Sequence, residues 1–455
     1  MSEEVREIYI ELWSLCKDVE RPLCHKYRSL RELFERVARG QMQNVSLQAT
    51  DLAARINYLA TQYSLDRWVK NALHTFRLTS NDVMNHRKEP LEEEFFRDIR
   101  AVAEAIQVIY HTPIPKELTG ILPVQMPKYS MKREKNVLER RIRVSFEYAD
   151  AEFLYVTPVD EVSDEYWKIR YNQLGVNDEF TEGIKEYWRH AQLNLLDVKR
   201  NEDGTYTPSF IVLEPDYLVD ISALAECYRD YGSHPANYIM SRLVPIDNAR
   251  PLLLGNIANL FLDEWIYASE EEPEYLDCMK KVFKRYPVEL AACEELLDKE
   301  KETAFFKDCQ MHFEHIRQTV KDTFLESGYN LDKSDAVLEP SYICEALGVQ
   351  GRLDYMQRDM SSFIEMKSGK ADEYAMKGKL EPKENNRVQM LLYMAVLEYS
   401  MGIDRRKQHP YLLYTRYPLL YPARASWAQV RRIIALRNRI VAAEYGTQMH
   451  NHPSY

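Results

Sequence analysis

The sequence lacks several features that would assign the protein to a class at once. None of its seven cysteines stands in a CxxC pair, and their odd number argues against a disulfide framework, so we expect a reducing, cytoplasmic location. There is no apolar run of about 18 residues, so no membrane span is expected. The phosphate-binding pattern GxxxxGK[ST] is absent. The N-terminal stretch MSEEVREIYIELW also lacks the basic-then-apolar layout of a secretion signal.

What is present indicates a globular protein of several domains. The chain has 455 residues, of which 45% are hydrophobic and 29% are charged. This length favours roughly two to four domains. The formal net charge of −11 argues against a surface coated for nucleic acid, although binding depends on where the cations lie rather than on their sum.

The pattern of apolar residues changes twice along the chain, which predicts a multi-domain α/β fold. Residues 1–120 predict a helical N-terminal region, because apolar residues recur at spacings of three and four and Gly40 is the only glycine before residue 110. Residues 121–215 are rich in β-forming residues and predict a small barrel-like domain with one helix inserted over 180–198. Residues 216–455 alternate helical and strand patterns, as in a domain with a mixed central sheet.

One stretch, GRLDYMQRDMSSFIEMKSGK at 351–370, concentrates the chemically active residue types. Residues two apart on a strand share a face, so Glu365 and Lys367 should point the same way, with Asp354 on a neighbouring strand. Two carboxylates so placed can hold Mg²⁺ or Mn²⁺, with the carbonyl of Met366 as a third ligand. A lysine beside that metal can position water or stabilise charge on a phosphate. The alternative is an exposed ion pair worth under about 1 kcal/mol.

A helical segment downstream carries a second pair of candidates. In QMLLY, Gln389 and Tyr393 are four residues apart and so lie on one helix face, from which they could orient the lysine or contact phosphate. They could equally be an ordinary capping and core pair. The intervening segment is polar and rich in lysine, and it suits contacts to a nucleic-acid backbone. Our candidates for such contacts are Arg352, Lys370, Lys377, Lys379 and Arg387.

The order Gly-Arg-Leu-Asp, Glu-x-Lys-x-Gly and Gln-x-x-x-Tyr resembles the PD-(D/E)xK nuclease superfamily, in particular its RecB-like branch. The similarity spans residues 222 to 415. It implies a restriction-endonuclease-like fold and hydrolysis of DNA that depends on Mg²⁺ or Mn²⁺. In that branch a metal-binding histidine follows a glycine by four positions; here Gly255 matches the glycine and Asn259 replaces the histidine. Asp263 and Glu339 are substitutes for the missing ligand.

The order of the regions is also similar to the nuclease part of flap-processing nuclease–helicases. This resemblance implies a single-stranded or flap DNA substrate in replication or repair, and a helicase domain or subunit as partner. Cys227 matches the first of four cysteines that hold an iron–sulfur cluster in those proteins. No cysteine follows Cys344, so we expect no cluster.

Other readings of the sequence stay open. The protein could be a decayed nuclease acting as a nucleic-acid-binding scaffold, which Asn259 favours, or a defence nuclease acting on duplex DNA. Zinc could bind Cys309, His312 and His315 on one helix face, although no fourth ligand is evident. Basic runs at 128–143 and 405–407 could form a track for a nucleic-acid strand. Endonuclease or exonuclease action is undetermined.

Overall fold

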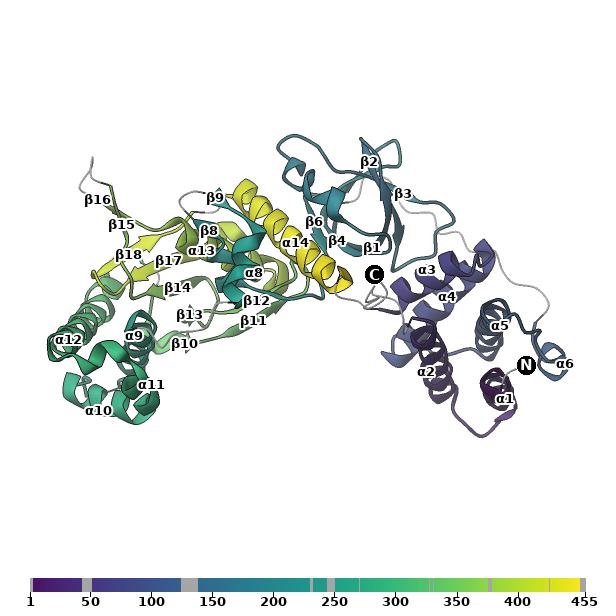
Figure 1. Cartoon of the computed structure of the whole chain (residues 1–455), viewed down its shortest axis with the longest axis horizontal. Coiled ribbons are helices and arrows are strands. Elements are labelled where there is room, and N and C mark those ends of the chain that lie inside the picture. Colours follow the sequence, from purple (N-terminus) through teal and green to yellow (C-terminus); the bar gives the residue numbers. More distant parts are fainter. Residues whose placement is uncertain are drawn as a thin grey trace. The chain divides into compact units, whose positions relative to one another are not determined.

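The computed structural model describes residues 3–42, 51–123, 138–229, 232–243, 250–269, 271–326, 328–329, 331–374, 379–424 and 426–450 (Figure 1). The chain divides into two compact units, which we call unit 1 (1–216 with 441–455) and unit 2 (217–440). Unit 1 therefore holds both the helical region and the β-rich region, which we expected as separate domains. The fold is a mixed α/β architecture with N-terminal helices, a barrel-like sheet and further mixed sheets.

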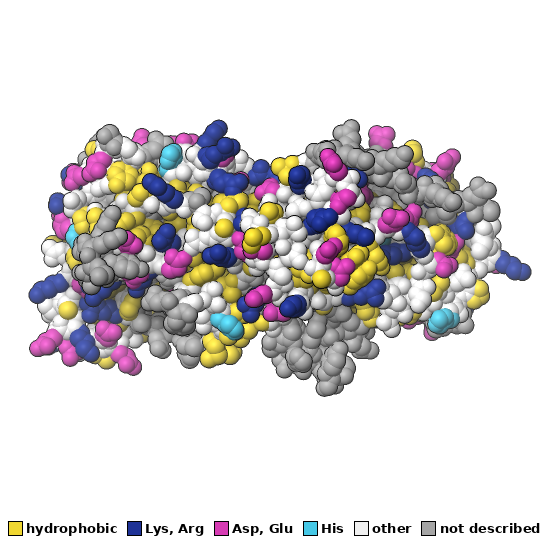
Figure 2. Space-filling model, turned by 90° about the horizontal axis from the view of Figure 1, so that it is seen from above, with side chains coloured by type: hydrophobic (Ala, Val, Ile, Leu, Met, Phe, Trp, Pro, Cys, Tyr) yellow, Lys and Arg dark blue, Asp and Glu magenta, His cyan; other side chains and the backbone are white. Residues whose placement is uncertain are grey.

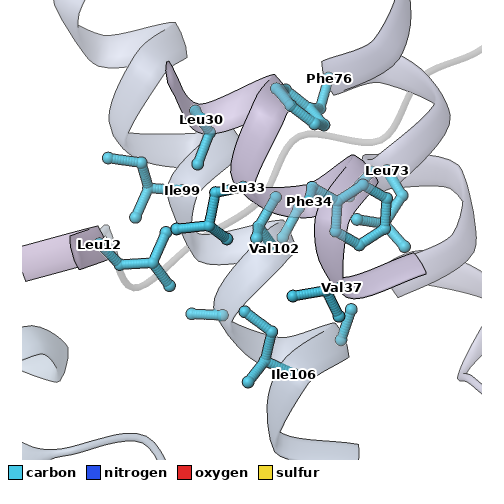
Figure 3. Packing of buried hydrophobic residues seen from close by; sticks show 14 of the residues in the cluster. Leu12, Leu30, Leu33, Phe34, Val37, Leu73, Phe76, Ile99, Val102 and Ile106 are labelled. Atoms are coloured by element: carbon cyan, nitrogen blue, oxygen red, sulfur yellow. The ribbon is translucent and has the colours of Figure 1, made fainter. Parts of the chain in front are cut away.

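Unit 1 begins with helices whose apolar faces meet in one core. They are α1 (Glu3–Lys17), α2 (Leu23–Gln41), α3 (Leu52–Gln62), α4 (Arg67–Met84), α5 (Glu92–Ile109) and the short α6 (Lys116–Thr119). In α2 the fully buried Tyr27, Leu30, Phe34 and Val37 recur every three or four residues, the spacing that aligns side chains on one face. Figure 3 shows side chains of α2, α4 and α5 interdigitating in this core.

A buried carboxyl lies inside this helical core. The hydroxyl of Tyr27 donates a 2.9 Å hydrogen bond to Asp98 of α5. Burial, with a smaller contribution from the nearby Glu94, raises the pKa of Asp98 to about 7, although the hydrogen bond from Tyr27 opposes the shift. The fold therefore favours the neutral form of this acid.

The β-rich part of unit 1 is a closed five-stranded barrel with one added strand. Strands β1, β2, β3, β5 and β4 follow one another in the sheet, β1 also pairs with β4 to close it, and β6 pairs with β4. Their bounds are β1 (Leu138–Ala149), β2 (Phe153–Pro158), β3 (Trp167–Arg170), β4 (Gln192–Arg200), β5 (Tyr206–Thr207) and β6 (Phe210–Leu213).

Our prediction of a helix over 180–198 is wrong. The chain there forms short 3-10 turns at Asp178–Phe180 and Gly183–Glu186 and then enters β4. β4 pairs with β1 along one edge and with β5 and β6 along the other, so its backbone groups are satisfied by strands from elsewhere in the chain. This pairing outweighs the local helical preference of the segment.

Unit 2 is built around a five-stranded sheet of order β10-β13-β14-β17-β18, in which only β14 and β17 are parallel neighbours. A smaller sheet has the order β11-β12-β7. The strands are β7 (Val219–Asp220), β8 (Tyr228–Arg229), β9 (Gly232–Ser233), β10 (Ala336–Leu338), β11 (Ser341–Cys344), β12 (Val349–Arg352), β13 (Tyr355–Gln357), β14 (Ser362–Lys367), β15 (Asp372–Tyr374), β16 (Lys379–Glu381), β17 (His409–Tyr414) and β18 (Leu419–Pro422).

Unit 2 also contains several helices. They are α7 (Ile221–Ala225), α8 (Pro235–Leu243), α9 (Arg250–Tyr267), α10 (Tyr275–Arg285), α11 (Pro287–Ala292), α12 (Lys299–Lys321), α13 (Glu384–Met401) and the unit 2 part of α14 (Trp427–His450). Ile364 and Met366 of β14 belong to the core that α9 and α12 form, whereas α13 meets Glu365 and Lys367. The two faces of β14 thus have different partners, as the alternation of its residues predicted.

The last helix is attached to unit 2 by a buried arginine. Arg437 of α14 is fully buried, and its guanidinium donates to the carbonyls of Gly348 (3.1 Å) and Tyr217. Gly348 has a φ of 64°, and a Cβ at that position would collide with the guanidinium. The hydroxyl of Ser426 accepts a hydrogen bond from the amide of Gln429 at the start of α14.

Two further findings concern the whole described chain. All seven cysteines are free thiols. None of the helices in the described ranges is both long enough and apolar enough to cross a bilayer.

The Asp98 carboxyl predicts a pH dependence of stability. Because folding raises its pKa from about 4 to about 7, the folded state binds more protons in that interval, and the free energy of unfolding should fall as pH rises from 4 to 7. Asp98→Asn mimics the neutral acid and should flatten this slope. The total change in unfolding free energy between pH 4 and 7 should shrink by about 1.4 kcal/mol for each unit of pKa shift that the substitution removes. Urea unfolding across this pH range measures it.

The raised pKa of Glu214, also about 7 through burial, should leave a residual slope in the variant. Unfolding curves of the wild type and Asp98→Asn that stay parallel at every pH would contradict the assignment.

The Gly348–Arg437 contact predicts a second stability effect. Gly348→Ala combines an unfavourable positive φ with the steric clash, and we expect it to cost more than about 2 kcal/mol of unfolding free energy. Gly402→Ala is the matched control, because Gly402 has a φ of 73° but open space around it. Equal losses in the two variants would show that the clash is relieved without cost.

Candidate active site

The register of β13 and β14 brings the two predicted acids together. Tyr355 pairs with Ile364 in antiparallel register, so the next step along places Asp354 opposite Glu365. The Oδ2 of Asp354, which lies just before β13, accepts a 2.6 Å hydrogen bond from the amide of Met366. The acids therefore approach one another at the carboxyl end of β14.

Lysine and glutamine side chains complete a connected polar cluster beside the acids. The ammonium of Lys367 lies 2.9 Å from Oε1 of Glu365 and donates to Oε1 of Gln389 at 2.7 Å. The amide of Gln389 donates to Glu365 (2.6 Å) and to the hydroxyl of Ser222 (3.0 Å). Three separate elements, β14, α13 and α7, thus hold one glutamate and one lysine in fixed positions.

Burial and like charge dominate the electrostatics of this cluster. Burial raises the pKa of Glu365, and the neighbouring Asp354 carboxylate raises it further. Burial also raises the pKa of Asp354, against the lowering effect of the Met366 amide. Burial alone would lower the pKa of Lys367, but Glu365 outweighs it and the net shift is upward. The lysine is therefore the charge that compensates two mutually repelling acids.

One face of α9 approaches the same place. Gly255, Asn259 and Asp263 are four residues apart and lie along one helix face. A Cβ on Gly255 would lie 3.4 Å from Oγ of Ser368, just beyond β14. Burial, Glu339 and Asp354 raise the pKa of Asp263 to about 6, while Arg285 opposes them. Asn259 lies between the two on this face of α9, at the position where the resemblance implies a histidine, and its role as a metal ligand stays a prediction.

Glu339 lies at the edge of the site, in a backbone conformation that non-glycine residues rarely adopt. It follows β10 with a φ of 49°, its amide donates to the carbonyl of Asp354 at 3.1 Å, and its carboxylate lies 3.3 Å from the guanidinium of Arg352. Its position beside Asp354 agrees with the role of a substitute ligand that we predicted, although that role stays a prediction.

Tyr393 lies one turn after Gln389 on α13 and hydrogen-bonds to the backbone near the site. It is fully buried, and its hydroxyl donates a 2.6 Å hydrogen bond to the carbonyl of Arg352. A Cβ on Gly351 would lie 3.0 Å from the same hydroxyl. Tyr393 therefore braces the end of β12. Burial and Glu365 raise the pKa of Tyr393, and a hydrogen bond with Gln389 opposes the shift, so the residue also interacts with the cluster. Its predicted role in orienting the lysine or contacting phosphate stays a prediction. Gln389 does contact the lysine.

The structure describes the side chains of three of the five residues that we predicted to contact phosphate. Arg352, Lys370 and Arg387 are exposed side chains of unit 2. Lys377 and the side chain of Lys379 lie outside the described residues, as do residues 128–137 of the basic run. On the face shown in Figure 2, lysine and arginine side chains are interspersed with acidic ones rather than gathered in a continuous band.

The donor groups suit a hard divalent cation. In the described part of the chain no three or more His, Cys, Asp or Glu side chains are grouped closely enough to hold a metal ion. However, Mg²⁺ commonly binds through one or two carboxylates and retains several waters. Oε2 of Glu365 is buried without a hydrogen-bond partner among the described residues, an arrangement that a cation would satisfy. The contact seen for Met366 involves its amide; ligation by its carbonyl stays a prediction.

The remaining cysteine and histidine candidates are buried in helices or hydrogen-bonded to backbone carbonyls. Cys309 and His312 are buried in α12, and His315 contacts the carbonyl of Thr415 through Nδ1. Burial raises the pKa of the Cys309 thiol to about 12, which disfavours the thiolate that zinc requires. Cys227 is buried, and its thiol donates to the carbonyl of Ala223.

Sequence reasoning missed two residues near the cluster. Ser222 contacts Gln389 from α7, and Arg285 at the end of α10 lies close enough to lower the pKa of Asp263. No local pattern marks either residue, because each comes close only through packing of distant segments.

Comparison of the sequence with known protein-family models and with characterised proteins gives no match.

The position of Tyr393 predicts a structural rather than a chemical role. Tyr393→Phe removes one buried hydrogen bond to a backbone carbonyl and should lower the free energy of unfolding by about 1 kcal/mol or somewhat more. It should leave divalent-metal affinity unchanged, since the hydroxyl contacts neither acid. Unfolding and Mn²⁺ titration of the variant test this, and a large loss of metal affinity with normal stability would contradict it.

Proposed function

We propose that this protein is a metal-dependent nuclease that hydrolyses phosphodiester bonds in DNA, with single-stranded or flap DNA as its substrate in replication or repair. Unit 2 would then be a RecB-like nuclease domain of the PD-(D/E)xK superfamily. The observation that carries the proposal is the convergence of Asp354, Glu365, Lys367 and Gln389 in one hydrogen-bonded cluster, in which the glutamate and the glutamine are buried and the other two are half-buried. A chance set of surface charges would be neither buried nor mutually bonded.

The side chains divide the chemical work. Asp354 and Glu365, with Asn259, Glu339 and the Met366 carbonyl as further candidates, would hold Mg²⁺ or Mn²⁺. The bound cation would supply Lewis-acid charge and an acidified water. Lys367 would stabilise negative charge on the phosphate or orient the attacking water, and its bond to Gln389 limits the directions in which the ammonium can point. Arg352, Lys370 and Arg387 would contact the nucleic-acid backbone.

A second candidate function is a decayed nuclease that binds nucleic acid as a scaffold. Two observations favour it: asparagine occupies position 259, and the described residues contain no group of three metal-binding side chains. Loss of a strong ligand would weaken metal binding while leaving the fold and its exposed cations intact. The two functions therefore differ in metal affinity rather than in architecture.

The first test is cleavage of end-labelled single-stranded DNA in Mn²⁺. Lys367→Ala should reduce the cleavage rate by at least about 100-fold, because it removes the positioned charge from a water-poor site. Lys280→Ala, at an exposed lysine of α10, is the matched control and should cleave normally. EDTA should abolish cleavage. Equal activity of the wild type and Lys367→Ala would refute the assignment, and duplex substrate run in parallel tests action on paired DNA.

Calorimetry with Mn²⁺ separates a nuclease from a decayed one. An active site requires Mn²⁺ affinity that falls in Asp354→Asn and persists in Asp277→Asn, a control at an exposed acid of α10. Absence of Asp354-dependent binding, with DNA still bound, would establish the scaffold function.

A further inference from the structure

An aromatic ladder stands on the outer face of the barrel in unit 1. Register places Tyr148 of β1 opposite Tyr155 of β2, and Tyr155 opposite Lys168 of β3; in the next row Phe153 lies opposite Arg170. The alternate residues Leu154, Val156 and Ile169 are fully buried, so the ladder residues point outward from the barrel interior.

The rings of this ladder contact one another and the cations between them. Tyr148 and Tyr155 are stacked with centroids 4.3 Å apart, and Tyr166 meets Tyr148 edge-on at 6.0 Å. The ammonium of Lys168 lies 5.8 Å from the centroids of both Phe153 and Tyr155. We call the set formed by Tyr148, Phe153, Tyr155, Tyr166, Lys168 and Arg170 the aromatic face.

Much of this apolar surface stays in contact with solvent. Tyr148 is 49% exposed and Tyr166 is 44% exposed, and Lys168 is exposed beside them. Neighbouring exposed rings on one sheet face are unusual in a region with no recognition role. A purely structural ladder would stabilise the sheet through its cross-strand contacts alone, which does not require that the rings stay exposed to solvent.

The aromatic face is held in a fixed arrangement by short polar contacts. The hydroxyl of Tyr155 donates to Asp150 at 2.8 Å, and Asp150 also accepts from the amides of Glu152 and Phe153. Asp203 lies 2.8 Å from the guanidinium of Arg170. These bonds hold the Tyr155 ring, on which Tyr148 stacks, and they pair the Arg170 cation with an acid.

We propose that the aromatic face binds unpaired nucleic-acid bases by stacking. Planar rings beside cations are the chemistry by which proteins hold single strands without sequence preference, because every base has a π-face. The acids Asp150 and Asp203 offset the cations, so the ligand's bases rather than its phosphates supply the affinity here. The choice of single-stranded DNA as ligand rests on the proposed function, whereas the stacking surface itself rests on unit 1 alone.

The test therefore compares a strand that has bases with a strand that has only the phosphate backbone. Full-length protein in EDTA is titrated into a labelled oligothymidine, and separately into an abasic phosphodiester strand of the same length, with binding followed by fluorescence anisotropy. The double variant Tyr148→Ala with Tyr166→Ala should bind oligothymidine about tenfold more weakly and the abasic strand as before. The double variant Tyr148→Phe with Tyr166→Phe keeps both rings and should bind oligothymidine like the wild type.

Two features keep the test decisive. If the alanine variant unfolds, the double leucine variant retains apolar volume without a planar ring and should show the same loss of oligothymidine binding. Salt provides the second readout: the ratio between wild-type and variant affinities should stay constant as salt rises, since phosphate contacts would make it shrink.

The outcomes separate this inference from the nuclease proposal. Unchanged oligothymidine binding in the alanine and leucine variants, or an equal loss for the abasic strand, would overturn it and leave the ladder as structural or as a protein-binding surface. Because EDTA removes divalent metal throughout, a protein that never cleaves DNA can still show base-dependent binding, and one that cleaves can lack it.

Discussion

Two like-charged carboxylates that face each other at the end of β14 impose the strictest requirement on unit 2. Asp354 and Glu365 meet because β13 and β14 are antiparallel in a register that aligns them; Glu365 is buried and Asp354 is half-buried. Such a pair is unfavourable unless cations or donors compensate it. Lys367, Gln389 and the Met366 amide provide that compensation. The buried Oε2 of Glu365 marks where a divalent cation would complete it.

The surrounding elements can be understood as supports for this pair. α13 must lie against the Glu365 face of β14 for Gln389 to reach the lysine, and α7 supplies Ser222 to hold the other end of the same amide. One turn further along α13, Tyr393 ties the helix to the carbonyl of Arg352. On the opposite face of β14, Ile364 and Met366 pack in the core with α9 and α12, so the strand cannot rotate without burying charge in that core.

The barrel of unit 1 depends on backbone pairing and carries aromatic side chains on its outer face, in contrast to the polar cluster of unit 2. The barrel is closed by backbone pairing of β1 with β4, and its interior includes the fully buried Leu154, Val156 and Ile169. Its outer face carries the tyrosines and cations of the aromatic face, whose charges are offset by Asp150 and Asp203. A net charge of −11 is thus compatible with nucleic-acid binding, because stacking does not need an excess of cations.

The sequence alone determined the helical N-terminal region, the barrel-like middle and the alternation of β14, because hydrophobic periodicity is a local property. It also placed Glu365 and Lys367 on one face, and Gln389 on the helix that meets them. The strand β4 could not be predicted as such, since its pairing partners are distant in sequence and override the local preference. Likewise only the tertiary structure assigned Tyr393 to the Arg352 carbonyl and brought Ser222 and Arg285 close to the acids. Local spacing determines which way a side chain points, but burial and partners depend on segments that meet only after folding.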